Sequence, residues 1–505
     1  MAFSLSFENP ILTKELRTRM RGAKAFWILL LYLGLLSVIL GGTYLSWLVS
    51  QEQQGANATQ SYDMGRMFYG VIFAVQAALV GLITPALTSG ALSIEREQRT
   101  FEALSVSPLP RRSIIVGKLA SAVGFVGLLL LSSLPLVALC FLLGGVSPQE
   151  VCAAYVLLMA SAFLYGATGI AFSSFAKNTT SATVLTYGTI LVLFFSTLPL
   201  SLMALNLSTA TTYSYAHPFL LGVNPVGAMV AGSLTESYFG LAVPSWLVGI
   251  TVNGLLGTIL TIVALHRIEY PRSDRSGLLR GLTMLFVGLL ALLGSGGSGT
   301  VAGTAVGVAL LPLLFIPLFV SGEGLGAKRL REQLFRLKEG NPVSGLLFVA
   351  GLVVLSASLV LLGIAYMHLA TPEQQWHTRT GFLPLAGKAT TVVLSALFGF
   401  GTLTLLLSQK LKNRWGTMAL SFVILAAAYF LPLTAESYTN YNEPISVWIN
   451  SYYFSPLTSF VCLENYSTRV ARGLFFGMES MWWINSAFTS LLGVISLLLI
   501  KRARR

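Results

Sequence analysis

Charged residues are scarce in this chain. Of its 505 residues only 10% are Asp, Glu, Lys or Arg, whereas 54% are hydrophobic. Soluble domains carry about 25% charged residues. Charged residues this scarce could not cover the water-exposed surface of a folded soluble protein of this length. The composition therefore excludes a soluble protein and predicts one that lies in a lipid bilayer.

Cysteines and catalytic motifs are scarce as well. Three cysteines exclude a disulfide framework. The string nearest to a phosphate-binding loop, Gly381–Ala389, has one residue too many between its glycines and an Ala where a hydroxyl is required. No HExxH, CxxC or GxSxG pattern occurs. We therefore expect neither an enzyme nor a cofactor or metal bound by this chain.

Long apolar runs are plentiful instead. A membrane-spanning helix needs about 20 apolar residues, and twelve stretches of this kind predict an all-α integral membrane protein. The stretches are Ala25–Val49, Phe68–Ile94, Ser113–Leu143, Val151–Ala176, Ala182–Ala204, Ser245–His266, Leu278–Leu293, Val301–Ser321, Val343–Met367, Ala389–Ser408, Thr417–Leu433 and Trp482–Ile500.

The basic residues predict the orientation of these spans. If the N-terminus is cytoplasmic, the segments on that side hold 27 of the 32 Lys and Arg residues, and the opposite segments hold five. Lys and Arg accumulate on the cytoplasmic side of membrane proteins, so both termini are expected there. The net charge of +13 then reflects topology, and nucleic acid is excluded as a partner.

This threading leaves no Asp, Glu, Lys or Arg for the middle of a span. Charged residues inside spans mark proton relays and ion pathways. Their absence disfavours an ion-coupled or facilitative carrier, which stays an alternative together with a membrane scaffold that does not transport. Uphill transport would then draw its energy from outside the membrane.

Two cytoplasmic segments carry further patterns. In residues 5–24, Lys14, Arg17, Arg21 and Lys24 follow one helical face, which favours a helix lying in the membrane interface. Plain topogenic charge before the first span is the alternative. Segment 93–118 is long for a turn and ends its predicted helix at two prolines. Such a short amphipathic helix favours docking into a groove on another protein.

Segment 93–118 also carries an ordered motif. It runs acidic, basic, acidic, then Thr-x-Glu, two apolar residues, Pro-Leu, a basic residue and Gly-Lys. The residues are Glu95, Arg96, Glu97, Thr100, Glu102, Leu104, Pro108, Leu109, Arg112, Gly117 and Lys118. Together with the opening Asn9-Pro10, the motif resembles the membrane subunit of type-2 ABC transporters (ABC-2 permeases) over residues 9–270. Arg99 departs from the pattern, because a Gly usually precedes the Thr.

The resemblance implies a function and partners. In that family the loop is a coupling helix that docks on separately encoded cytoplasmic ATPase subunits, here with a contact surface from Glu95 to Leu109. It implies the permease subunit of an ATP-driven exporter in the plasma membrane, the inner membrane of a bacterium. Two ATPase subunits are expected as partners, and ATP and magnesium would bind to them.

The second half of the chain looks like a diverged copy of the first. Arg96-Glu97-Gln98 recurs 235 residues later as Arg331-Glu332-Gln333. We therefore expect two six-helix permease modules, at 1–266 and 280–505, joined by a cytoplasmic linker at 267–279. The second coupling segment would use Arg331, Glu332, Gln333 and Phe335. One chain would then hold both modules; a pathway formed with a second permease chain is the alternative.

Polar residues inside the spans are candidates for a transport pathway. The candidates are Gln76, Thr84, Thr186 and Tyr187. Such side chains more often bond across helices. Lipid, peptide, polysaccharide and drug are all compatible with these residues as substrates.

Substitutions in the proposed coupling segment test the docking hypothesis. We expect Glu102→Ala or Leu104→Asp to abolish transport, because each removes a side chain from the predicted contact surface. Membrane insertion, measured by fractionation, should stay intact. Normal transport by both variants would contradict the assignment.

Overall fold

The computed structural model describes residues 10–21, 23–54, 60–100, 110–176, 178–191, 235–269, 275–295, 311–320, 342–370, 382–411, 417–418, 420–425, 427–428 and 481–502. The chain divides into two compact units, Met1–Glu236 with Leu241–Leu282 (unit 1) and Ser237–Gly240 with Thr283–Arg505 (unit 2). Each unit is described by itself. The duplication and its module boundaries stay a prediction.

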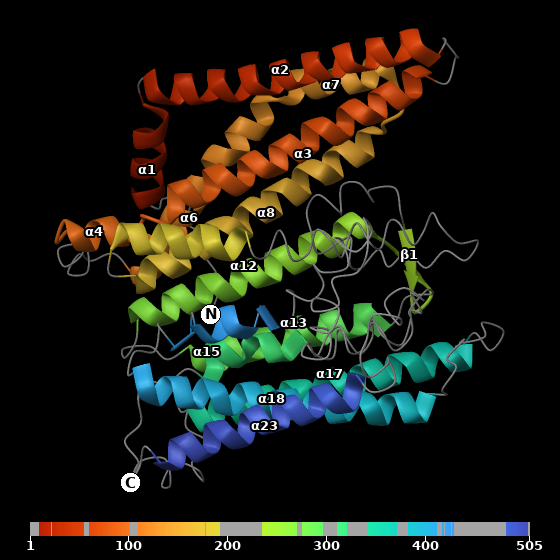
Figure 1. The fold of residues 1–505 in the computed structure, drawn as a ribbon. Helices are drawn as coiled ribbons and strands as arrows, with labels where there is room; N and C mark the ends of the chain where they lie inside the picture. The colour runs from red at the N-terminus through yellow and green to blue at the C-terminus, as the bar shows by residue number, and fades with distance from the viewer. Residues whose placement is uncertain are drawn as a thin grey trace. The chain divides into compact units, whose positions relative to one another are not determined.

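Helices dominate both units (Figure 1). The first part of the chain forms α1 Pro10–Met20, α2 Ala23–Gln54, α3 Gln60–Thr88, α4 Ser93–Glu97, α6 Arg111–Ser132, α7 Leu134–Leu143, α8 Pro148–Phe175 and α12 Ser245–Glu269. Residues 179–191 are also helical. The later elements are α13 Ser276–Ser295, η1 Leu311–Phe315, α15 Ile316–Val320, α17 Pro342–Ala370, α18 Phe382–Leu411 and α23 Met481–Arg502. A two-stranded hairpin, β1 Thr235–Tyr238 and β2 Leu241–Pro244, precedes α12 and was not predicted.

Nine helices among the described residues are long and apolar enough to cross a membrane. They are Ala25–Val49, Met64–Glu97, Arg111–Ser132, Pro148–Phe175, Ser245–Glu269, Gly277–Gly294, Gly345–Gly363, Thr391–Leu411 and Trp482–Lys501. The predicted all-α membrane protein is thus confirmed. The other three predicted spans, Ala182–Ala204, Val301–Ser321 and Thr417–Leu433, lie partly outside the described residues.

The third predicted span, Ser113–Leu143, is two helices instead of one. α6 ends at Ser132 and α7 begins at Leu134. Pro135 explains the break, because proline lacks an N–H and its ring clashes with the carbonyl four residues earlier. The Ser133 hydroxyl donates to the Leu130 carbonyl at 2.6 Å and accepts from Gln76 Nε2 at 2.7 Å. The break is therefore stabilised by a bond from α3.

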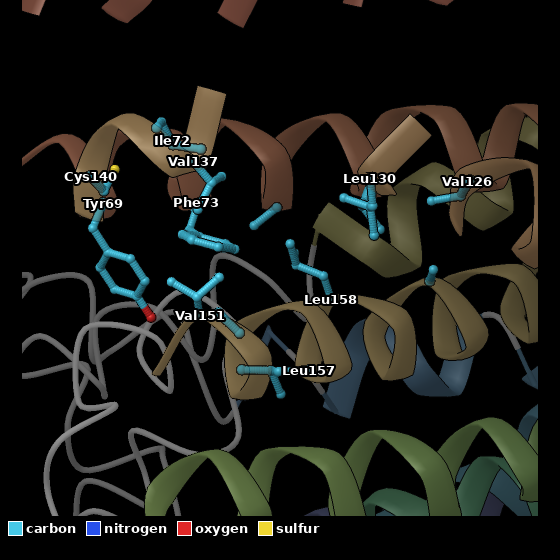
Figure 2. Packing of buried hydrophobic residues seen from close by; sticks show 14 of the residues in the cluster. Tyr69, Ile72, Phe73, Val126, Leu130, Val137, Cys140, Val151, Leu157 and Leu158 are labelled. Atoms are coloured by element: carbon cyan, nitrogen blue, oxygen red, sulfur yellow. The ribbon is translucent and has the colours of Figure 1, made fainter. Parts of the chain in front are cut away.

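The main core of unit 1 lies between α3, α6, α7 and α8 (Figure 2). Phe73 is fully buried, and its ring centroid lies 4.7 Å from that of Tyr69 and 5.3 Å from that of Tyr155. By contrast, Leu31 and Val38 on α2 are about 70% exposed, at 69% and 73%. Because α2 is a candidate span, these apolar side chains face the place that lipid tails would occupy.

α8 begins at a point that its sequence marks. Ser147 accepts the Glu150 backbone N–H, while the Glu150 carboxylate accepts the Ser147 N–H, and Pro148 stands at the first helical position. This reciprocal capping box satisfies backbone donors that a helix start leaves without partners.

α3 and α8 approach each other closely at glycines. A Cβ at Gly169 would lie 2.9 Å from Thr88 Cβ and 3.1 Å from the Ser89 nitrogen. Gly166, one turn away, would meet the Thr84 methyl at 3.4 Å. Small residues at helix contacts of this kind let membrane helices pack backbone to backbone.

Unit 2 has its own core between α15, α17 and α18, where Val349, Val392 and Ala396 are fully buried. Its helices also meet at glycines. A Cβ at Gly399 of α18 would clash with the Thr489 carbonyl of α23.

The glycine contact predicts a specific loss of stability. Gly169→Ala should cost about 1–3 kcal/mol, because the added methyl overpacks the α3–α8 contact. Gly254→Ala in α12 is the matched control, since no atom lies within 4 Å of its added Cβ. Thermal denaturation of the purified protein in detergent compares the two. Equal melting temperatures for both variants would show that close packing at Gly169 is not limiting.

Candidate functional site

α4 is a short helix held at one end of the spans of unit 1. It follows α3 after a tight turn, and its first backbone N–H groups are bound by α8. Ser173 Oγ accepts from the Leu92 N–H at 2.8 Å and from the Ser93 N–H at 3.0 Å. Leu92 is fully buried. We call this end of unit 1, where α4 lies, the α4 end.

A buried ammonium group connects α4 to two other helices. Lys118 Nζ of α6 lies 2.7 Å from Glu95 Oε1 of α4 and 3.3 Å from Glu15 Oε1 of α1. The Lys118 side chain is only 9% exposed, and the two glutamates are 22% and 26% exposed. Together with Arg19 we call these residues the Lys118 cluster.

Arg19 completes the cluster from α1. Its Nε lies 3.7 Å from Glu15 Oε2, and its Nη2 donates to the Leu87 carbonyl at the end of α3. Burial lowers the pKa of the Arg19 guanidinium, and the neighbouring Glu15 opposes this shift. The cluster therefore balances two cations with two carboxylates in a partly desolvated place, as buried charges require.

The other charged residues of α4 bind the turn after α8. Arg96 Nη1 donates to the Ala176 carbonyl at 3.2 Å. The Glu97 carboxylate accepts from both the backbone N–H and the hydroxyl of Thr179, each at 2.8 Å. Thr179 begins the helix over residues 179–191. Glu97 thus caps the N-terminus of that helix, although it lies 82 positions upstream in the chain. The helix dipole stabilises a negative charge at this end.

α4 ends in a left-handed turn. The Thr100 N–H donates to the Glu95 carbonyl, and the Arg99 N–H donates to the Arg96 carbonyl. This pair of bonds is the Schellman motif, whose left-handed position usually holds Gly. Arg99 occupies it with a φ of 57°. Arg99 therefore adopts the left-handed conformation that the family pattern assigns to Gly. Holding a residue with a side chain in this conformation costs about 1–2 kcal/mol of stability.

Several segments that the sequence places on the cytoplasmic side meet at the α4 end. Arg111 Nη1, at the start of α6, donates to the Ile268 carbonyl near the end of α12 at 2.6 Å. Ile11 of α1, Ile114 of α6 and Ile268 of α12 belong to one buried apolar cluster. In Figure 1, α1 and α4 lie at the same end of the spans of this unit.

The predicted coupling residues are only partly described. Glu95, Arg96, Glu97 and Thr100 come together at the α4 end, and the three charged side chains have partners within this chain. Ile94, Gln98, Arg99 and Thr100 are exposed. The remaining predicted residues, Glu102, Leu104, Pro108, Leu109, Arg331, Glu332, Gln333 and Phe335, lie outside the described residues.

Sequence reasoning missed the residues that hold α4. Ser173 and Thr179 were not singled out, because each contacts α4 from about 80 positions away in the chain. Glu15 reaches α4 only through Lys118, which lies 103 positions from it. Lys118 belongs to the motif, but the motif does not identify it as a partner of Glu95. Its place within the apolar helix α6 is the signal, because a lysine there requires a partner.

Three of the four predicted pathway residues bond across or within helices through their side chains, whereas the buried Thr84 hydroxyl has no hydrogen-bond partner in the described part of the chain. These residues are Gln76, Thr84, Thr186 and Tyr187. Gln76 is fully buried and donates to Ser133. Thr84 and Thr186 are also fully buried, and the Tyr187 hydroxyl donates to the Leu82 carbonyl at 2.7 Å. A role in lining a pathway stays a prediction. Within the described ranges, no group of three His, Cys, Asp or Glu residues could hold a metal.

The candidate spans, joined at the α4 end by the short helices α1 and α4, define a multi-pass membrane protein. A comparison with known families matches residues 9–270 to the family described as ABC-2 family transporter protein. The chain belongs to this family and is a membrane permease of an ABC transporter. The resemblance inferred from the sequence is thereby confirmed. A search of curated proteins found no match.

Removing the central cation should destabilise the α4 end. Lys118→Met removes the cation that binds Glu95 and leaves Glu15 with Arg19 alone among the described cations, at a cost of roughly 3 kcal/mol. Arg112→Met, an exposed position on the same helix, should change stability by less than about 0.5 kcal/mol. Thermal denaturation in detergent measures both.

A compensating variant separates charge from packing. Adding Glu15→Gln and Glu95→Gln to Lys118→Met removes the facing charges and should recover part of the lost melting temperature. No recovery would mean that uncompensated carboxylate charge is not the cause of the loss.

Proposed function

We propose that this permease is the transmembrane part of an ATP-driven exporter, coupled through α4 and the segment that follows it to two separately encoded cytoplasmic ATPase subunits. The observation that carries the proposal is the way α4 is held. Its backbone and charged side chains are bound by α6, α8 and the helix over residues 179–191, and Lys118 of α6 also binds Glu15 of α1. Its far end stays exposed.

This arrangement suits the transmission of force. A partner that displaces the exposed end of α4 would also displace the helices bound to it. Glu95 forms an ion pair with Lys118 of α6, and Glu97 accepts a hydrogen bond from Thr179. Movement of α4 would therefore shift the ends of several spans together. In this proposal both termini and the α4 end are cytoplasmic, which the distribution of basic residues favours. The membrane is the inner membrane of a bacterium, which the family favours.

Steric blocking of α4 tests the coupling. The tagged chain is purified from its native membranes in mild detergent, and bound ATPase is detected by labelling with photoreactive 8-azido-ATP and by ATP hydrolysis. Gln98→Trp places a bulky ring at the exposed end of α4. We expect about a tenfold loss of co-purified hydrolysis, which corresponds to about 1.4 kcal/mol of docking free energy.

The control carries the same substitution at the opposite end of unit 1. Gln149 is exposed at the start of α8, and a helix of this length separates it from the α4 end by about 42 Å. Gln149→Trp should retain the bound ATPase. A wild-type chain that purifies without ATPase and transports on an ion gradient in liposomes would overturn the proposal in favour of a secondary carrier.

A further inference from the structure

The two faces of α1 differ sharply in charge. Glu15 and Arg19 turn toward α6 and α3, where the Lys118 cluster neutralises them. Lys14, Arg17 and Arg21 are exposed, and no ion pair among the described residues involves them. Because Glu15 is the only acidic residue of α1 and it points inward, the exposed face carries cations alone.

This basic face lies beside the membrane. Arg21 stands four residues before the candidate span that begins at Ala25, and four residues reach at most about 14 Å. Phe26 and Trp27, at the start of that span, are 62% and 63% exposed. Figure 1 shows α1 turned steeply away from the direction of α2. α1 therefore runs across the end of a span, close to the level of lipid headgroups.

We propose that the exposed basic face formed by Lys14 and Arg17 of α1, together with Arg21 directly after it, binds the phosphate groups of anionic lipids. Neutral lipids offer no net charge to three cations, whereas an anionic leaflet attracts each Lys or Arg near its surface by about 1 kcal/mol, or roughly fivefold in affinity. Met20 adds an apolar contact, since it lies between these cations and is 51% exposed. The site requires only the bilayer and no ATPase, so it stands or falls independently of the proposed coupling.

A fluorescent probe on α1 tests the site in the full chain. Thr18 lies on the exposed face, and Thr18→Cys is labelled with a nitrobenzoxadiazole dye after Cys152 and Cys462 are changed to Ala; Cys140 is fully buried and stays. The protein is reconstituted in phosphatidylcholine vesicles that contain a small, equal fraction of nitroxide-labelled phosphatidylglycerol or nitroxide-labelled phosphatidylcholine.

We expect phosphatidylglycerol to quench the probe several-fold more than phosphatidylcholine does. Salt should reduce the difference, because it screens charges at a membrane surface. Arg17→Gln with Arg21→Gln should abolish the preference. Lys410→Gln with Lys501→Gln is the matched control, which removes two exposed cations from α18 and α23 and should leave the preference intact.

Two results would overturn the proposal. Equal quenching by both lipids would mean that α1 lies in the interface without selecting anionic headgroups. A probe that neither lipid quenches would mean that the face is turned from the bilayer, as expected if an acidic protein surface covers it.

Discussion

The α4 end of this permease depends on one buried charge. An ammonium group loses its hydration when Lys118 is buried in α6, and that loss is tolerable only where opposite charges replace the water. Glu15 and Glu95 do so from α1 and α4. Three segments that are far apart in the chain are therefore fixed to one point. Displacing α4 alone would remove Glu95 from Lys118 and leave Glu15 as its only carboxylate partner among the described residues. The positions of α1, α4 and α6 are therefore coupled energetically.

α4 itself illustrates how such constraints replace intrinsic stability. A helix of five residues has too few backbone bonds to form alone. Its start is bound by Ser173, its charged residues bind α6 and the helix over residues 179–191, and its end closes in the turn at Arg99. The left-handed Arg99 is strained, yet it persists because the Schellman bonds around it are made. The permease thus imposes a conformation that the segment would not adopt by itself.

The sequence predicted the spans well, because their signal is local. Apolar runs of sufficient length mark helices in a bilayer, and the family motif located α4. Pro135 marked the break in the third span, but the apolar run around it concealed this signal. Of the partners of α4, only Lys118 belongs to the motif; its second partner Glu15 is 103 positions away, and neither Ser173 nor Thr179 belongs to a motif. Long-range pairing of this kind is fixed by packing, which leaves no periodic trace in the sequence.

The same inward pairing determines the charge of the surface. A basic segment before a span could neutralise itself if its acidic residues faced its own cations. Here Glu15 is drawn into the junction by Lys118, and Arg19 follows it at the i+4 position. The remaining cations of α1 are left on the opposite face, where α1 itself holds no acidic residue. One buried lysine therefore holds the junction together and also leaves α1 with a strongly basic outer face.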